Sequence, residues 1–327
     1  MTNKEITKVI FNNSEISALY YGDVLVWEKE NTEEYGVNTF AGKFTDDSTE
    51  SDWVMYKFGF PNDYTKVIIP VDTETKEFNY ELEWSENYNW LHITNMPSKI
   101  QHIYHLPYNL IINSEYGLRG MFDGCSYLET CNLNGLKGHN FTDVSFLFNR
   151  CEKLKSIEFN LDGLNVTNMD NTFYGCSALS SLDLSSFNTA ACTNMNNTFY
   201  GCSALSSLDL SSFNTAACTN MNQTFYGCSA LSSLDLSSFN TAACTNMNQT
   251  FYGCSKLTTI TGVFEGTKVD LDLHYSPLTN ESAMVFINGL ANVGETKTIK
   301  FKSTTYNTLT PEQIAIATSK GWTVISI

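Results

Sequence analysis

The residues in this chain best suited to redox chemistry or metal binding are its ten cysteines. Six of them recur at intervals of 26, 25, 26, 26 and 26 residues, and three more repeat with a period of 26. Cysteines stacked at such a period could form disulfides, hold a metal ion or pack in a core. The first series is Cys125, Cys151, Cys176, Cys202, Cys228 and Cys254, and the second is Cys192, Cys218 and Cys244.

Packing is the role we expect for these thiols. Side chains stacked in register point in parallel, which does not suit the torsion angle of a disulfide. The sequence has no C-x-x-C or Cys/His spacing typical of a zinc site, and its five histidines are not periodic. Val166 occupies the position of Cys192 one repeat earlier, as an apolar packing position allows. We therefore expect free structural thiols, no metal site and no cofactor.

The fixed period indicates a protein built from stacked repeats. Three consecutive units differ only at Asn197, Gln223 and Gln249. A unit that touches only its neighbours can be duplicated in this way, whereas part of a unique globular core cannot. The three units are residues 173–198, 199–224 and 225–250.

Each unit predicts one strand and one short helical segment. Leu179-x-x-Leu182-x-Leu184 matches the leucine-rich-repeat pattern, and its alternation with polar residues predicts a strand with leucines inward. Thr193 to Tyr200 returns apolar residues at spacings of three to five, which predicts one or two turns of α- or 3₁₀-helix. Stacking then gives an α/β solenoid of 26-residue repeats, with a parallel sheet on one face, advancing about 4.8 Å per unit, and short helices on the other.

Three columns of this repeat carry polar side chains. Each tyrosine that follows an inward phenylalanine should face outward, where a stripe could stack on sugar rings, form a protein interface or cover backbone. The strand aspartates could bind a cation or glycan hydroxyls, or keep an acidic face soluble. The asparagines of the T-N-M phrase should bond to backbone groups. The columns are Tyr174, Tyr200, Tyr226 and Tyr252; Asp183, Asp209 and Asp235; and Asn168, Asn194, Asn220 and Asn246.

The phrase Thr167-Asn168-Met169-x-x-x-Phe173-Tyr174-Gly175-Cys176-Ser177-x-Leu179 resembles the BspA-like family of leucine-rich repeats. That family occurs in bacterial surface adhesins and in bacteriophage proteins, and the resemblance covers roughly residues 94–275. It implies a solenoid that presents a surface to a partner. The stretches Leu309 to Ala317 and Lys320 to Val324 resemble the terminal module of such proteins.

We divide the chain into a small β module at residues 1–30, a small antiparallel β domain at 31–93, the solenoid at 94–275 and α/β capping repeats at 276–327. In the last part, Thr279 should begin a helix, and Lys297 to Phe301 should form a strand. Thr310, with Pro311 and Gln313 after it, should cap a second helix. Gly321 should end that helix, before a strand from Trp322 to Ile327.

The N-terminal module holds three short β-type runs, with turns at Asn12-Asn13 and Gly22-Asp23. A unit of this size needs a partner to be stable. One phrase in it resembles short N-terminal modules of phage virion and tail-associated proteins, and this resemblance implies an anchor to other virion proteins. Its residues are Tyr20, Tyr21, Gly22, Asp23 and Trp27.

Composition narrows the function further. The net charge of −16 makes nucleic acid an unlikely partner. No apolar run is long enough for a signal peptide or a spanning helix, so we expect synthesis in the host cytoplasm and no membrane insertion. No catalytic triad, carboxylate pair or phosphate loop is recognisable, so we expect no catalytic residues.

These features favour a non-enzymatic bacteriophage structural protein, located on the virion as a tail, baseplate or head-fibre appendage. The N-terminal module would contact other virion proteins, the solenoid would meet a host-surface glycan or protein, and a homo-oligomer is left open. The alternative is a bacterial cell-surface adhesin, which should carry a signal peptide and an anchor.

Overall fold

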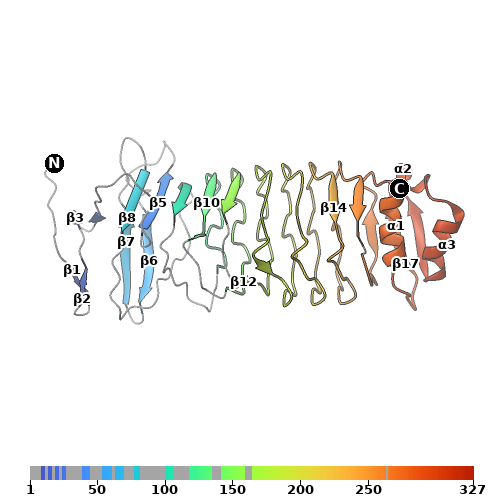
Figure 1. The fold of residues 1–327 in the computed structure, drawn as a ribbon, viewed down its shortest axis with the longest axis horizontal. Helices are drawn as coiled ribbons and strands as arrows, with labels where there is room; N and C mark the ends of the chain where they lie inside the picture. Colours follow the sequence, from blue (N-terminus) through green and yellow to red (C-terminus); the bar gives the residue numbers. More distant parts are fainter. Residues whose placement is uncertain are drawn as a thin grey trace.

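The computed structural model describes short paired strands between residues 9 and 105, then residues 118–134, 141–158, 164–262 and 264–327. From residue 164 onward, successive repeats form coils that lie side by side along the long axis of the molecule (Figure 1). Parallel bridges join Asn168 to Asn194, Asn194 to Asn220 and Asn220 to Asn246, one repeat apart. The chain is therefore a repeat protein with short parallel strands and few helices.

A regular hydrogen-bond ladder links successive coils through the turn segment, which we define as residues 194–202 and their equivalents. Every second peptide group in this segment accepts a bond from the previous coil and donates one to the next, at 2.7–2.9 Å. The donors are the N–H groups of Met195, Asn197, Phe199 and Gly201, and the acceptors are the carbonyls of Asn220, Asn222, Thr224 and Tyr226. The intervening N–H groups of Asn196, Thr198, Tyr200 and Cys202 bond within their own coil.

This ladder replaces the short helices that we expected on this face. A helix would direct every N–H along its own axis to the residue four before it, and none would reach the next coil. In the turn segment Asn197 and Gly201 instead adopt left-handed conformations, with φ of 53° and 70°. These two residues turn alternate peptide groups toward neighbouring coils. The prediction of helices in the repeats is wrong for the described coils, which have hydrogen-bonded turns there.

The leucine segments alternate inward and outward as predicted, with Leu184 buried and Asp183 exposed. They form parallel strand pairs at the two ends of the coil stack, where β10 (Thr130–Asn132) pairs with β11 (Ser156–Glu158) and β14 (Ser233–Asp235) pairs with β15 (Thr259–Thr261). Between these pairs the segments of two identical units are not strands. One more parallel pair, β12 (Leu164–Asn165) with β13 (Phe187–Asn188), lies at a coil corner.

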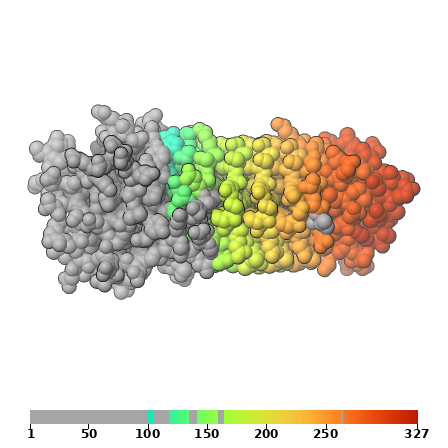
Figure 2. Space-filling view, viewed as in Figure 1, coloured from blue at the N-terminus to red at the C-terminus, as the bar shows by residue number. Residues whose placement is uncertain are grey.

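The core is a set of columns, because each coil places the same buried side chain over its neighbour. Six phenylalanine rings from Phe122 to Phe251 form five stacked pairs with centroids 5.1–6.0 Å apart. Cysteine, methionine and leucine columns surround them and are almost fully buried. Burying each Leu or Phe contributes about 1.5–3 kcal/mol, so the apolar columns supply most of the stability. In the space-filling view the coils run into the C-terminal module as one continuous body (Figure 2).

At the N-terminal side the described strands form antiparallel pairs. The turns expected at Asn12-Asn13 and Gly22-Asp23 fall between paired strands. The second β region shares a five-stranded sheet with the first coils, in the order β11-β10-β9-β5-β8. The antiparallel pairs are β1 (Val9–Phe11) with β2 (Ser14–Ile16), β3 (Leu19–Tyr21) with β4 (Val24–Val26), β5 (Thr39–Phe44) with β8 (Glu77–Glu81) and with β9 (Ile100–His105), and β6 (Val54–Phe60) with β7 (Asp63–Ile69).

The C-terminal module is a three-stranded parallel sheet covered by helices. Its elements are β16 (Leu271–Leu273), α1 (Asn280–Gly289), β17 (Lys297–Phe301), α2 (Ser303–Tyr306), α3 (Pro311–Ser319) and β18 (Trp322–Ser326). The predicted N-caps Thr279 and Thr310 are confirmed, and Thr310 forms a capping box with Gln313. Gly289 is required because a Cβ there would lie 1.7 Å from the Phe264 carbonyl oxygen. The sequence did not predict α2.

The three duplicated units differ at a single position of the repeat, occupied by Asn197, Gln223 and Gln249. Substitutions at this position test the ladder. Asn197, Gln223 and Gln249 all have φ of 53–54°, and Asn tolerates the left-handed region better than Gln does. We expect the double variant Gln223→Asn and Gln249→Asn to raise the free energy of unfolding by about 1 kcal/mol, measured by urea denaturation. The matched control Asn197→Gln should lower it. A double variant less stable than the parent would contradict this account of the turn.

Candidate interaction surface

The tyrosine column (Tyr174, Tyr200, Tyr226 and Tyr252) lies immediately after the buried phenylalanines, on the outer side of the turn segment. Its rings are half-buried and nearly parallel, with centroids 4.5, 4.4 and 4.7 Å apart and interplanar angles of 10°, 4° and 7°. The glycine after each tyrosine has a positive φ of 70–75°. Successive glycines approach closely, and this brings the ring of each coil onto the next.

Because the rings stack on one another, their faces are already in contact inside the column. Burial, followed by the neighbouring phenols of Tyr174 and Tyr226, raises the pKa of Tyr200. The column therefore offers a partner ring edges and hydroxyl groups, and a sugar ring cannot stack on the face of an internal tyrosine. This arrangement favours a flat contact with another macromolecule over stacking with single sugar rings along the column.

Amide side chains run beside the tyrosines. Asn196 donates to Asp170 at 2.7 Å, and Asn222 donates to Asn196 at 2.8 Å, so one amide chain crosses several coils. The T-N-M asparagines act as predicted, because Asn194 accepts the backbone N–H of Asn196, and Asn168, Asn220 and Asn246 do the same in their coils. Between residues 173 and 250 the only charged residues are the three strand aspartates. The surface beside Tyr200 and Tyr226 is thus polar and uncharged, whereas Asp170 places a carboxylate at the start of the amide chain.

The aspartate column (Asp183, Asp209 and Asp235) is exposed on the leucine side, and each carboxylate accepts the backbone N–H of the serine two residues later at 2.9 Å. The hydrogen bonds to Ser185 lower the pKa of Asp183, and those to Ser237 lower the pKa of Asp235. The backbone N–H and side chain of Ser211 lower the pKa of Asp209. These carboxylates therefore hold the turn that follows each leucine segment, a structural role that the sequence analysis did not assign to them.

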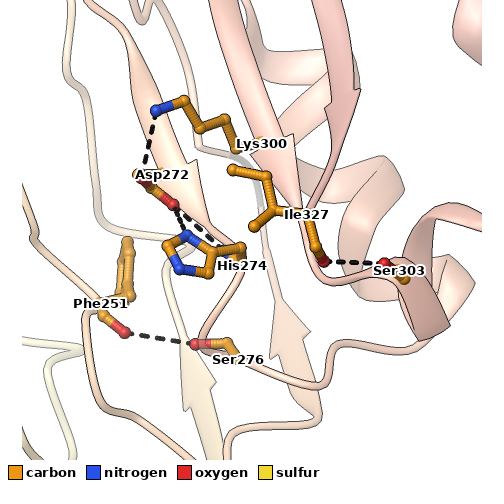
Figure 3. Close-up of polar contacts among 7 residues, drawn as sticks. All are labelled: Phe251, Asp272, His274, Ser276, Lys300, Ser303 and Ile327. Atoms are coloured by element: carbon orange, nitrogen blue, oxygen red, sulfur yellow. Dashed lines mark hydrogen bonds and ion pairs between the residues drawn. The ribbon is translucent and has the colours of Figure 1, made fainter.

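The tyrosine column ends at the C-terminal module beside a cluster of different side chains, of which Figure 3 draws Asp272, His274 and Lys300. His274 Nδ1 contacts Asp272 Oδ1, and Lys300 Nζ lies 3.5 Å from Asp272 Oδ2. Tyr275 contacts the last column member, Tyr252, with centroids 3.8 Å apart at a 45° tilt. A hydrogen bond to Tyr252 raises the pKa of Tyr275. The sequence analysis missed this cluster, although the replacement of repeat residues by His, Tyr and Asp signals it.

The expectation that the thiols pack is confirmed, since all ten cysteines are buried and none forms a disulfide. In the first series, Cys202 Sγ lies 3.2 Å from the Phe173 carbonyl of the previous coil. In the second, Cys192 lies 3.5 Å from the Asn194 carbonyl. Burial raises the pKa of Cys192 to about 11 and that of Cys218 to about 12. Among the described residues, no group of three or more His, Cys, Asp or Glu could hold a metal ion.

The anchor residues lie mostly outside the described part of the chain. Tyr20 and Tyr21 belong to β3, which pairs antiparallel with β4. Gly22, Asp23 and Trp27 are outside the described residues.

Among the helices that the structure describes, none combines the length and apolarity needed to cross a bilayer.

The tyrosine column should stabilise the stack as well as present a surface. We expect Tyr200→Ser to lower the free energy of unfolding by about 1–3 kcal/mol, because it removes two ring–ring contacts. Tyr200→Phe keeps both contacts and should stay within about 0.5 kcal/mol of the parent. Chemical denaturation of the two variants checks this. A serine variant as stable as the phenylalanine variant would show that the stack contributes nothing.

The buried thiols predict a loss of stability in alkali. Their pKa values in the folded chain lie above the ordinary 9.0, so the folded state keeps protons that the unfolded state releases. Stability should be constant below about pH 8 and fall as the pH rises above about 9, measured by denaturation at each pH. Replacing Cys192, Cys218 and Cys244 by Val, the residue found at position 166, should make this fall smaller. An identical alkaline loss in that variant would exclude these three thiols as its cause.

The comparisons with known proteins agree with the repeat. A family model described as "Mycoplasma protein of unknown function, DUF285" matches residues 72–181, 116–232 and 167–270. The three overlapping matches together cover more than half of the chain and follow the repeated coils, in agreement with BspA-like repeats. No curated protein gives a significant match. This chain belongs to the DUF285 family of repeat proteins.

Proposed function

We propose that this chain is a non-enzymatic BspA-like leucine-rich-repeat solenoid of a bacteriophage particle, which presents its turn-segment face to the host surface or to a neighbouring protein. The observation that carries the proposal is the tyrosine column, with rings 4.4–4.7 Å apart on a backbone ladder that repeats in every coil. A rigid, periodic and flat surface suits contact with an extended partner.

The chemistry of the columns supports binding over catalysis. An active site brings groups of different kinds together once, with matched geometry. The coils instead present the same tyrosine, asparagine or aspartate at each step, and each aspartate already holds a turn. Repeated identical groups increase contact area and avidity toward a repetitive partner.

The electrostatic character of the face favours a neutral partner. The chain carries 35 acidic and 19 basic residues, yet no basic residue lies between positions 173 and 250. Nucleic acid and anionic lipid need cationic surfaces. A host-surface glycan or an uncharged protein surface could instead meet the tyrosine edges and amides.

The phage assignment rests on the N-terminal module. The phrase Tyr20-Tyr21-Gly22-Asp23 with Trp27 resembles modules of virion and tail-associated proteins. Hairpins as short as β1–β2 and β3–β4 are marginally stable alone and are stabilised by a partner. In this proposal that partner is another virion protein, and the solenoid projects outward, as one copy or as a homo-oligomer.

Immunogold electron microscopy tests the proposal and separates it from a bacterial adhesin. Antibodies raised against the purified chain are applied to phage particles and to uninfected cells of the source organism. We expect label on particle appendages, and less label when residues 1–30 are deleted from the phage-encoded copy. Label on the envelope of uninfected cells would support the adhesin alternative. Label on neither surface would contradict both functions.

A further inference from the structure

The sheet of the C-terminal module has one edge that no described strand covers. Its strands are ordered β16-β17-β18, so β18 pairs with another strand only on its β17 side. The module lies at one end of the coil stack, with α3 beside β18 at the tip (Figure 1). The outer side of β18 is therefore an edge of the sheet at the end of the elongated molecule.

The hydrogen bonds to β17 determine which peptide groups of β18 point to this edge. The Gly321 carbonyl accepts from β17, and the N–H of Ile327 donates to the Phe301 carbonyl. Because successive residues of a strand direct their N–H and C=O groups to opposite sides, the alternate residues between these two point outward. Among the described residues, none bonds to the outward backbone groups, which belong to Trp322, Val324 and Ser326.

The edge of β18 lacks the features that usually prevent strand pairing. Proteins protect an exposed edge with charged side chains, proline or a bulge. The segment 322–327 is uncharged, contains no proline, and β18 pairs with β17 in unbroken register. Ser303 holds the end of the segment, since its N–H and Oγ lie 2.8 and 2.9 Å from the Ile327 carbonyl oxygen (Figure 3). The strand is thus held extended up to its last residue.

Apolar side chains accompany the edge. Ile327 is 50% exposed and Ile316 of α3 is 37% exposed, and they are two of the three exposed large hydrophobic side chains among the described residues. Ile325, in β18 itself, is half-buried. This edge therefore offers a partner both unpaired backbone groups and apolar surface.

The charge distribution favours a second copy of the chain as that partner. Residues 276–327 carry four lysines and three glutamates, whereas residues 1–275 carry 15 basic and 32 acidic side chains. Two copies lying side by side bring their acidic parts together, and two copies meeting at their C-terminal modules keep those parts far apart. Contact at this end therefore avoids most of the electrostatic repulsion between copies.

We propose that β18 pairs antiparallel with β18 of a second copy, about a two-fold axis at Val324. In this register Val324 faces its own equivalent and Trp322 faces Ser326, and each such pair exchanges two backbone hydrogen bonds. Every outward N–H and C=O group of both strands is then satisfied. Thr323 and Ile325 of opposite strands become neighbours on one face, a favourable pairing of β-branched side chains.

The same pairing limits the assembly to a dimer. A two-fold contact uses the same edge in both copies, so a third copy finds no free β18 edge. The contact involves neither the turn segment nor residues 1–30. The inference is thus independent of the proposed function and adds a surface for self-association to it.

Sedimentation equilibrium of the full chain tests the dimer. We expect the average mass to rise from 36.7 kDa toward twice that value as the protein concentration increases from micromolar to millimolar. Val324→Pro removes an outward N–H at the centre of the contact and keeps the bonds to β17. Thr323→Lys brings two ammonium groups close together across the two-fold axis. Each variant should weaken association at least about tenfold.

Thr323→Val is the matched control, because it changes the same side chain without adding a charge, and it should associate like the parent. Circular dichroism and thermal melting check that each variant is folded, and Thr323→Lys keeps the test decisive if the proline variant is not. Hydrogen exchange locates the contact. The amides of Val324 and Ser326 should gain protection as concentration rises, whereas those of Thr323 and Ile325 should be protected at every concentration.

Two results would overturn the proposal. A parent chain that stays monomeric at every concentration excludes the second copy and leaves the edge to a strand of another protein. A dimer that persists at full strength in both Val324→Pro and Thr323→Lys places the contact on another surface.

Discussion

Alternate peptide groups of the turn segment bond to the coil before and the coil after, and this ladder constrains the rest of the repeat. The N–H of Phe199 and the carbonyl of Thr198 belong to one peptide group and point to opposite neighbours. That geometry needs a left-handed residue at Asn197 and at Gly201. It also fixes the register between coils, so each buried phenylalanine and cysteine lies over its equivalent. The apolar columns supply most of the energy, and the ladder determines where they meet.

The same register creates the outer surface. Tyrosines that follow the inward phenylalanines are brought to a spacing of 4.4–4.7 Å, where the rings can only stack. Their faces are in contact inside the column, so its outer surface consists of ring edges, hydroxyls and amides. Where the repeat ends, Tyr275 is tilted by 45° against both Tyr252 and His274, with ring centroids 3.8 Å apart in each pair. A periodic outer surface and a unique cluster at its end thus follow from the register between coils and from its end.

Much of this was predictable from the sequence, because exact duplication restricts the fold to a stack. The buried thiols, the inward leucines and the caps at Thr279 and Thr310 follow from period, alternation and capping chemistry. The helices expected at Thr193 to Tyr200 do not form, because apolar spacing alone cannot distinguish a helix from a turn whose alternate amides bond outward. Ring stacking and the Asp272–Lys300 contact depend on distances between coils, which no local pattern contains.

Hydrogen exchange of individual backbone amides tests the ladder most directly. The account predicts that the amides of Met195, Asn197, Phe199 and Gly201, and their equivalents in neighbouring coils, exchange slowest and together, because each opens only when two coils separate. Amides of the leucine segments between β11 and β14 should exchange faster. Fast exchange in the turn segment with strong protection along the leucine segments would contradict the account, since the sheet would then lie on the leucine face.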